Sequence, residues 1–310
     1  MSGGVQMKRS LTALLLAALC ALCAPVLALS PDDVNSWAQA EAILPMDGLW
    51  PAVKPSYAQQ YGFAPVELAP QDALDTLNRA YNAAHEAGYD PVLSGWGLTQ
   101  AAWIPYGRPE HVTLGEGVNL AGTYADVEAI RFQGDWSSDV SLIFVREEYG
   151  GWQLIDCVRG DAKALRAADE EGMSGIAFIE CEELGHGTGY YAEMVQVYNP
   201  VTRQTEAAYT RTGYECPFDD RNLFLSADAD YGWDGLRIVV SAVFGGYTWE
   251  GDCRVFTQRA QMSEVYAYGY DADTHSLSLG VHGRCEGLSV AALRAVSVSE
   301  YLGGEVGFIY

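Results

Sequence analysis

Apolar and polar residues alternate over short stretches through most of the chain after residue 110. A period of two is typical of β-strands, because successive side chains point to opposite faces of a sheet. The apolar stretches are separated by Gly, Asn, Asp and Pro, the residues that favour turns. We therefore expect a β-hairpin region with a polar connector over residues 111–172 and a β-rich C-terminal domain over residues 173–310.

Two neighbouring apolar runs, Val140–Arg146 and Trp152–Val158, flank Gly150-Gly151. A Gly-Gly pair between such runs predicts a β-hairpin. The alanine-rich polar stretch over residues 160–173 predicts a connector with a helical turn or two. Further strands, with Gly245-Gly246 as one of the turns between them, are expected near residues 175–183, 190–198, 205–214, 222–226, 236–244, 247–256, 262–270, 276–282, 288–298 and 305–310.

The region before residue 110 has a helical periodicity instead. Ser30 and Pro31 predict the start of a first helix, because serine caps helices and proline favours the first helical position. Apolar residues recur at helical spacing in a second predicted helix, from about residue 70 to 87. The sequence thus predicts an α+β, β-rich fold, with a helical N-terminal segment over residues 29–110 followed by an antiparallel β-sandwich or a partly open barrel.

Residues 1–28 have the order of a secretory signal peptide. Lys8 and Arg9 are the only charged residues before Asp32. An apolar stretch follows them, and Ala28 ends a small-residue segment after which we expect cleavage. An uncleaved membrane anchor is the competing interpretation, since the apolar stretch is nearly long enough for a span, but Pro25 interrupts it. We expect a secreted or otherwise extracytoplasmic mature chain without a membrane span.

The chain is strongly acidic. Removing the two basic residues of the signal peptide from the total of 18 leaves 16 against 41 acidic residues, so the formal net charge changes from −23 to −25. Nucleic-acid-binding proteins carry basic patches, so this charge argues against nucleic acid as a partner. A glycan, another cell-envelope component, a cation or a basic partner stays open.

Five cysteines follow the predicted signal peptide, namely Cys157, Cys181, Cys216, Cys253 and Cys285. Export permits disulfides, but an odd number leaves at least one thiol without an intramolecular partner. Their wide spacing does not fit a structural zinc site, which uses close cysteine pairs. We expect one or two disulfides and a buried thiol.

The glycine-rich stretch over residues 185–189, Gly-His-Gly-Thr-Gly, is the most unusual local pattern. Glycine reaches positive φ and allows a ligand to approach the backbone closely, and His186 could act as a general base. The simpler interpretation is a tight or bulged loop between two strands. Partners for a catalytic histidine would come from the residues just upstream, Glu180, Cys181, Glu182 and Glu183.

Asp228, Asp230 and Asp234 precede Gly235 in a short acidic stretch. Calcium prefers several oxygen ligands from one loop, so the three aspartates form a candidate calcium site. Their spacing departs from that of an EF-hand, and aspartate and glycine are also common in ordinary turns. Both interpretations stay open, and no other cofactor is predicted.

Tyr266, Tyr268 and Tyr270 alternate along one predicted strand and therefore share a face. Such a stripe could bind a ligand by stacking on sugar rings. The alternative is a half-buried ladder of cross-strand contacts, the usual role of tyrosines in strands.

The sequence contains no nucleophile elbow, no HExxH zinc motif and no phosphate-binding loop. Active sites are often assembled from distant residues, so this does not exclude an enzyme. The favoured function is a non-catalytic binding or accessory module at the cell surface or in the medium. The alternatives are a secreted hydrolase with a site near His186 and a purely structural accessory domain.

Overall fold

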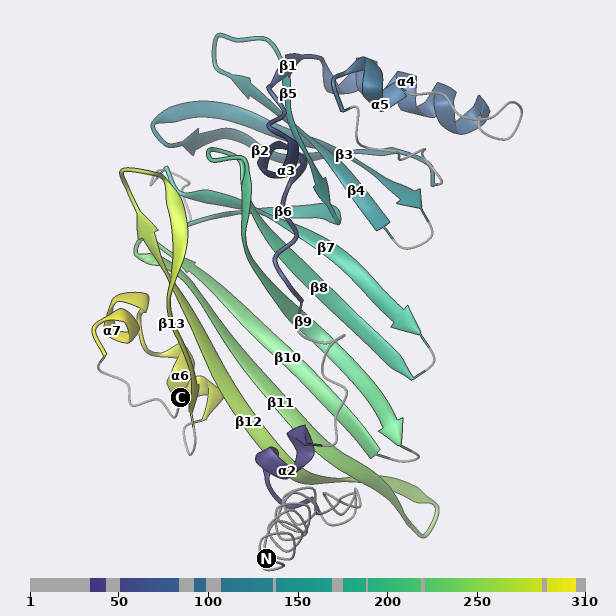
Figure 1. The fold of residues 1–310 in the computed structure, drawn as a ribbon, viewed down its shortest axis with the longest axis vertical. Helices are drawn as coiled ribbons and strands as arrows, with labels where there is room; N and C mark the ends of the chain where they lie inside the picture. Colours follow the sequence, from purple (N-terminus) through teal and green to yellow (C-terminus); the bar gives the residue numbers. More distant parts are fainter. Residues whose placement is uncertain are drawn as a thin grey trace, which may run out of the picture.

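The computed structural model is β-rich, with two antiparallel sheets and few helices (Figure 1). The predicted signal peptide and the predicted strand at 305–310 lie outside the described residues. Across the part of the chain that is described, no helix is long and apolar enough to cross a membrane. The structure describes residues 34–42, 51–83, 92–98, 107–135, 138–168, 175–187, 189–218, 221–285 and 289–304.

The first sheet has five strands in the order β1-β5-β4-β3-β2. β4 and β5 pair across Gly150-Gly151, which confirms the predicted hairpin. One face of this sheet packs against helices α3 (Tyr57–Tyr61), α4 (Pro70–Ala83) and α5 (Val92–Gly95). The strands are β1 (Val66–Glu67), β2 (Glu110–Leu120), β3 (Thr123–Asp135), β4 (Ser138–Glu147) and β5 (Gln153–Arg159).

The second sheet has eight strands, and each strand pairs with the next one along the chain. The outer strands of this meander are β6 and β13. The strands are β6 (Asp161–Ala167), β7 (Ala177–Gly187), β8 (Tyr190–Asn199), β9 (Gln204–Phe218), β10 (Arg221–Gly232), β11 (Gly235–Glu250), β12 (Cys253–Asp271) and β13 (Ser276–Cys285).

Three predicted elements were wrong. The polar stretch after Gly160 is strand β6, because pairing with β7 and burial of Ala162 between the sheets outweigh the helical preference of alanine. Gly245 lies inside β11 at a bulge, where a side chain would collide with the Phe256 ring. The strand expected over 288–298 is replaced by helices α6 (Val290–Arg294) and α7 (Val298–Leu302), each capped by a serine hydroxyl.

The predicted helical N-terminal segment is not supported as a whole. Ser30, the predicted cap, lies outside the described residues, and helix α2 (Trp37–Glu41) begins instead after Ser36. Only α4 among the described helices of this region is longer than five residues, and it covers the first part of the helix predicted from residue 70 to 87.

The eight-stranded sheet buries apolar side chains on both of its faces. The inner face, defined by residues such as Phe178, Leu225, Ile238 and Phe244, packs against α2. The opposite face packs against the five-stranded sheet over β7 and β8 and against α6 and α7 over β11 and β12. The two sheets are therefore joined through apolar contacts rather than through a shared strand (Figure 1).

Strands β9 and β10 pair along only part of their length. The ladder runs from the pair Phe218–Arg221 to the pair Thr212–Ser226 and stops there. From Ala227 onward β10 pairs with β11 alone, while the first part of β9 pairs with β8 alone. The eight-stranded sheet thus splits at one end, and the cleft described below lies at this split.

No disulfide joins any of the five described cysteines, in contrast to the one or two disulfides expected. The physical reason is that they lie in separate parts of the molecule. Cys157 lies among the side chains beneath α3 and α4, Cys181 lies between the sheets, and Cys285 lies beneath α6 and α7. Cys253 lies exposed at the start of β12.

We expect iodoacetamide to alkylate Cys253 in the folded protein at least about a hundredfold faster than Cys157 or Cys181. Burial raises the pKa of the Cys157 and Cys181 thiols, so little reactive thiolate forms, and the reagent reaches them only after unfolding. Peptide mapping by mass spectrometry measures each rate, and Cys253→Ser should remove the fast reaction. Equal rates at Cys157 and Cys253 would contradict the burial described here.

Candidate functional site

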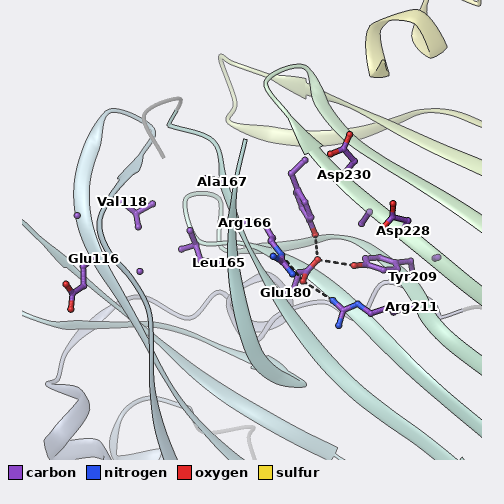
Figure 2. A pocket seen from close by; sticks show the side chains of 15 residues that line it. Glu116, Val118, Leu165, Arg166, Ala167, Glu180, Tyr209, Arg211, Asp228 and Asp230 are labelled. Atoms are coloured by element: carbon purple, nitrogen blue, oxygen red, sulfur yellow. Dashed lines mark hydrogen bonds and ion pairs between the residues drawn. The ribbon is translucent and has the colours of Figure 1, made fainter. Parts of the chain in front are cut away.

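An open cleft of about 830 Å³ lies between the β2 strand of the first sheet and the split end of the second (Figure 2). Volumes of a few hundred to a thousand Å³ are typical of ligand-binding sites. The cleft is lined by residues 115–118 of β2, 165–167 of β6, Glu180 of β7, Tyr209 and Arg211 of β9, and 227–231 of β10.

Irregular strand pairing shapes two sides of this cleft. On one side β9 and β10 have separated, so Tyr209 and Ala227–Tyr231 face the opening from different strands. On the other side β2 carries register shifts between Thr113 and Val118, and Gly117 adopts a left-handed φ of 59°. Bulges of this kind are frequent next to binding sites, because they redirect a strand and interrupt its ladder.

The buried carboxylate of Glu180 is the centre of the site. Its side chain is 3% exposed and accepts four hydrogen bonds. The Tyr209 and Tyr231 hydroxyls donate to Oε1 at 3.0 and 3.1 Å. Arg166 Nε and Arg211 donate to Oε2 at 3.1 and 2.9 Å (Figure 2). A carboxylate has about four acceptor positions, so the protein itself saturates Glu180.

Arg211 connects Glu180 to two further carboxylates. Its guanidinium pairs with Glu182 and with Glu193, the latter at 2.9 Å. Three glutamates thus surround Arg211, while Arg166 is half exposed and reaches the same Glu180 oxygen from β6. The cluster is charge-assisted throughout, which holds β6, β7, β8 and β9 in a fixed arrangement behind the cleft.

The two tyrosines of the site stay protonated over the physiological pH range. Burial raises the pKa of Tyr209 and of Tyr231, and the negative charge of Glu180 adds to the effect. Their hydroxyls therefore act as hydrogen-bond donors and not as bases. Together with the two arginines, these hydroxyls hold the Glu180 carboxylate in one position at the floor of the cleft.

The structure places His186 near the end of β7, opposite Tyr191 of β8. The side chain of His186 lies outside the described part of the structure. The loop predicted over residues 185–189 is shorter in the structure. Residues 185–187 belong to strand β7, and Gly189 adopts the left-handed φ of the turn. Glu180 lies six residues away on the same strand, roughly 20 Å along it.

The other residues named as partners for His186 have different contacts. Cys181 is buried between the sheets, Glu182 pairs with Arg211, and Glu183 pairs with Lys54. The contacts of the His186 side chain lie outside the described structure, so the hydrolase hypothesis stays a prediction.

Two of the three aspartates proposed for calcium belong to strand β10 rather than to a loop. Asp234 alone lies in the turn between β10 and β11. Their partners differ: Arg294 pairs with Asp228 at 3.0 Å, Arg237 with Asp230 at 2.6 Å, and the Ser299 amide donates to Asp234 at 3.0 Å. Among the described residues, no group of three or more His, Cys, Asp or Glu side chains is placed to hold a metal ion. The calcium hypothesis gains no support from this geometry.

The tyrosine stripe lies on β12 and faces the inner core of the eight-stranded sheet. Tyr268 is only 8% exposed, and Tyr266 and Tyr270 pack partly buried beside it. The Tyr266 ring stacks on the His282 ring, with the two ring centroids 4.2 Å apart, and the Tyr270 hydroxyl lies 3.1 Å from His275 Nδ1. These contacts favour the half-buried ladder for Tyr268, and the sugar-stacking hypothesis stays a prediction.

Comparisons with protein-family models, with curated proteins and with solved structures each find no match for this chain. The functional assignment therefore rests on the geometry of the cleft.

Proposed function

We propose that the protein is an exported, non-catalytic binding module and that its ligand docks in the cleft in front of Glu180. The observation that carries the proposal is the saturated carboxylate, because its four hydrogen bonds give the cleft a fixed polar floor against which a ligand can be oriented. The signal-peptide pattern supports a ligand outside the cytoplasm, at the cell surface or in the medium.

The cleft offers both polar and apolar contacts to such a ligand. The half-exposed guanidinium of Arg166 lies on one strand, and Leu165 and Val118 add apolar surface next to it (Figure 2). Sites of this kind bind through apolar area and take their orientation from a few fixed polar groups. Because the ion-pair cluster fixes the floor, little ordering cost arises when a ligand binds.

We propose further that the two sheets form a partial sandwich, with the rest of the eight-stranded sheet extending beyond it. Val127 and Ile143 of the first sheet pack against Ile179 and Tyr198 of the second, which supports this description. We also propose that the split end of the eight-stranded sheet carries the binding cleft and that the five-stranded sheet supports this end.

We expect Val118→Trp to weaken capture of the ligand by about tenfold or more, because an indole on β2 fills part of the cleft. Immobilised peptidoglycan and a glycan array serve as probes, with binding measured on the purified protein. Val112→Trp introduces the same ring on the same strand outside the cleft and should bind as the unaltered protein does. Thermal melts confirm that both variants fold. Unchanged capture by a folded Val118→Trp would exclude the cleft as the binding site.

A further inference from the structure

We propose that the β10 edge in this cleft binds an extended peptide with basic side chains, which adds to the sheet as a further strand. This inference rests on the proposed function, since it names the class of ligand for the same cleft.

The direction of the β10 backbone groups carries the inference. Neighbouring residues of a strand in an antiparallel sheet bond alternately to the strands on its two sides. Gly232 and Gly235 close a two-residue turn and form a pair that bonds to each other, so Asp230 and Asp228 also bond toward β11. The residues between them, Ala227, Ala229 and Tyr231, then direct their N–H and C=O groups to the other side.

On that side, β9 is no longer paired with β10. β9 stops pairing with β10 at Ser226, and the described residues provide no other strand paired with β10 from Ala227 to Tyr231. β6 approaches across the cleft but does not belong next to β10 in the sheet. Three amide donors and three carbonyl acceptors therefore line one side of the cleft.

An unpaired strand edge is a template for another strand. Peptides bind such edges through main-chain hydrogen bonds, and their alternate side chains give specificity. The five residues from Ala227 to Tyr231 span roughly 17 Å of strand, and the cleft of about 830 Å³ extends along them. The edge is thus open over a length that a short extended segment can pair with.

The charge beside this edge selects the peptide. Asp228 and Asp230 point away from Glu180 and toward the outer face of β10, where they pair with Arg294 and Arg237 and keep side chains 51% and 64% exposed (Figure 2). Side chains on the same face of an added strand would lie next to the exposed oxygens of these paired carboxylates, to which a lysine can donate hydrogen bonds and a glutamate cannot. The overall formal charge of −23 acts in the same direction, because it attracts cationic ligands.

The test uses a labelled peptide of alternating lysine and threonine and measures its binding by fluorescence anisotropy. Ala229→Pro removes an edge N–H but leaves the β11 ladder intact, since proline is tolerated where the N–H would face away from a partner strand. We expect this variant to bind roughly tenfold more weakly or worse. Ala229→Ser keeps the N–H and should bind within about twofold of the unaltered protein.

Three altered peptides repeat the test on the unaltered protein, which keeps it decisive even where Ala229→Pro fails to fold. Methylation of every second backbone nitrogen, in either register, should weaken binding about tenfold in the register that faces β10. Glutamate in place of lysine should weaken it by a similar factor, about tenfold. Equal binding of the methylated peptides in both registers would overturn the inference, as would no binding of the lysine–threonine peptide.

Two other occupants of the edge are distinguishable. A dimer seen by light scattering that Ala229→Pro converts to a monomer would mean that a second copy of the chain pairs there, and it would overturn the peptide proposal. Capture of a glycan that Val118→Trp abolishes and Ala229→Pro leaves unchanged would also overturn it, while the proposed function would stand.

Discussion

Asp156→Ala should lower the free energy of unfolding by about 3 kcal/mol at neutral pH. The side chain is fully buried on β5 and accepts hydrogen bonds from the Ala58 amide at 2.7 Å and from the Tyr198 hydroxyl at 3.1 Å. Ala58 belongs to α3 and Tyr198 to β8, so one carboxylate ties a helix and both sheets together. Alanine leaves both donors buried without an acceptor, and each such donor costs about 1–3 kcal/mol. Urea denaturation measures the loss.

Asp156→Asn is the matched control, because its amide oxygen still accepts from the backbone, and at neutral pH it should stay within about 1 kcal/mol of the unaltered protein. It also removes a titration. Burial raises the pKa of Asp156 from 3.8 to about 6. Between about pH 4 and 6 the folded state therefore holds a proton that the unfolded state has lost, so the stabilisation present below pH 4 disappears as the pH rises to 6.

The stabilisation that Asp156 loses between pH 4 and pH 6 amounts to roughly 3 kcal/mol. The difference in stability between the unaltered protein and Asp156→Asn should therefore decrease from pH 4 to pH 6 and stay constant above it. A difference that is flat over the whole range would contradict the raised pKa, and a difference that increases would mean that the pKa is lowered instead.

Period-two alternation predicts where many of the strands lie along the chain, but the residue at which each strand ends depends on tertiary contacts. β7, β8 and β9 lie within a few residues of the predicted strands. β10 is longer than predicted, because Ala227–Asp230 alternates residues with low strand preference and only pairing with the apolar run of β11 makes it a strand. Similarly, nothing local distinguishes Gly245 in a bulge from Gly245 in a turn, since the Phe256 ring that requires the glycine comes from another strand.

The cleft could not be predicted from local patterns, because its parts are far apart in the chain. Glu180 owes its role to Tyr209 and Tyr231, which lie 29 and 51 residues further along. One signal was present: Glu180 interrupts the apolar run that begins at Ile176, and an acidic residue at such a position indicates a buried ion pair. The sequence does not show its partner, or that β9 and β10 separate beside it.

Glu180→Ala should be the most damaging substitution within the cleft, lowering the free energy of unfolding by about 3–5 kcal/mol. Two tyrosine hydroxyls lose their buried acceptor, at about 1–3 kcal/mol each, and Arg166 and Arg211 lose the carboxylate that they share. Because the same contacts hold β6, β7 and β9 behind the cleft, we expect ligand capture to fall together with stability.

Glu182→Ala provides the matched control for that result. Glu182 lies on the same strand and pairs with the same Arg211, but its side chain is more exposed and no tyrosine bonds to it in the described structure. Arg211 keeps Glu180 and Glu193 in this variant, so the loss should be about 1 kcal/mol or less. Urea denaturation of both variants measures the two losses in the free energy of unfolding. A smaller loss for Glu180→Ala than for Glu182→Ala would mean that the saturated carboxylate does not organise the cleft.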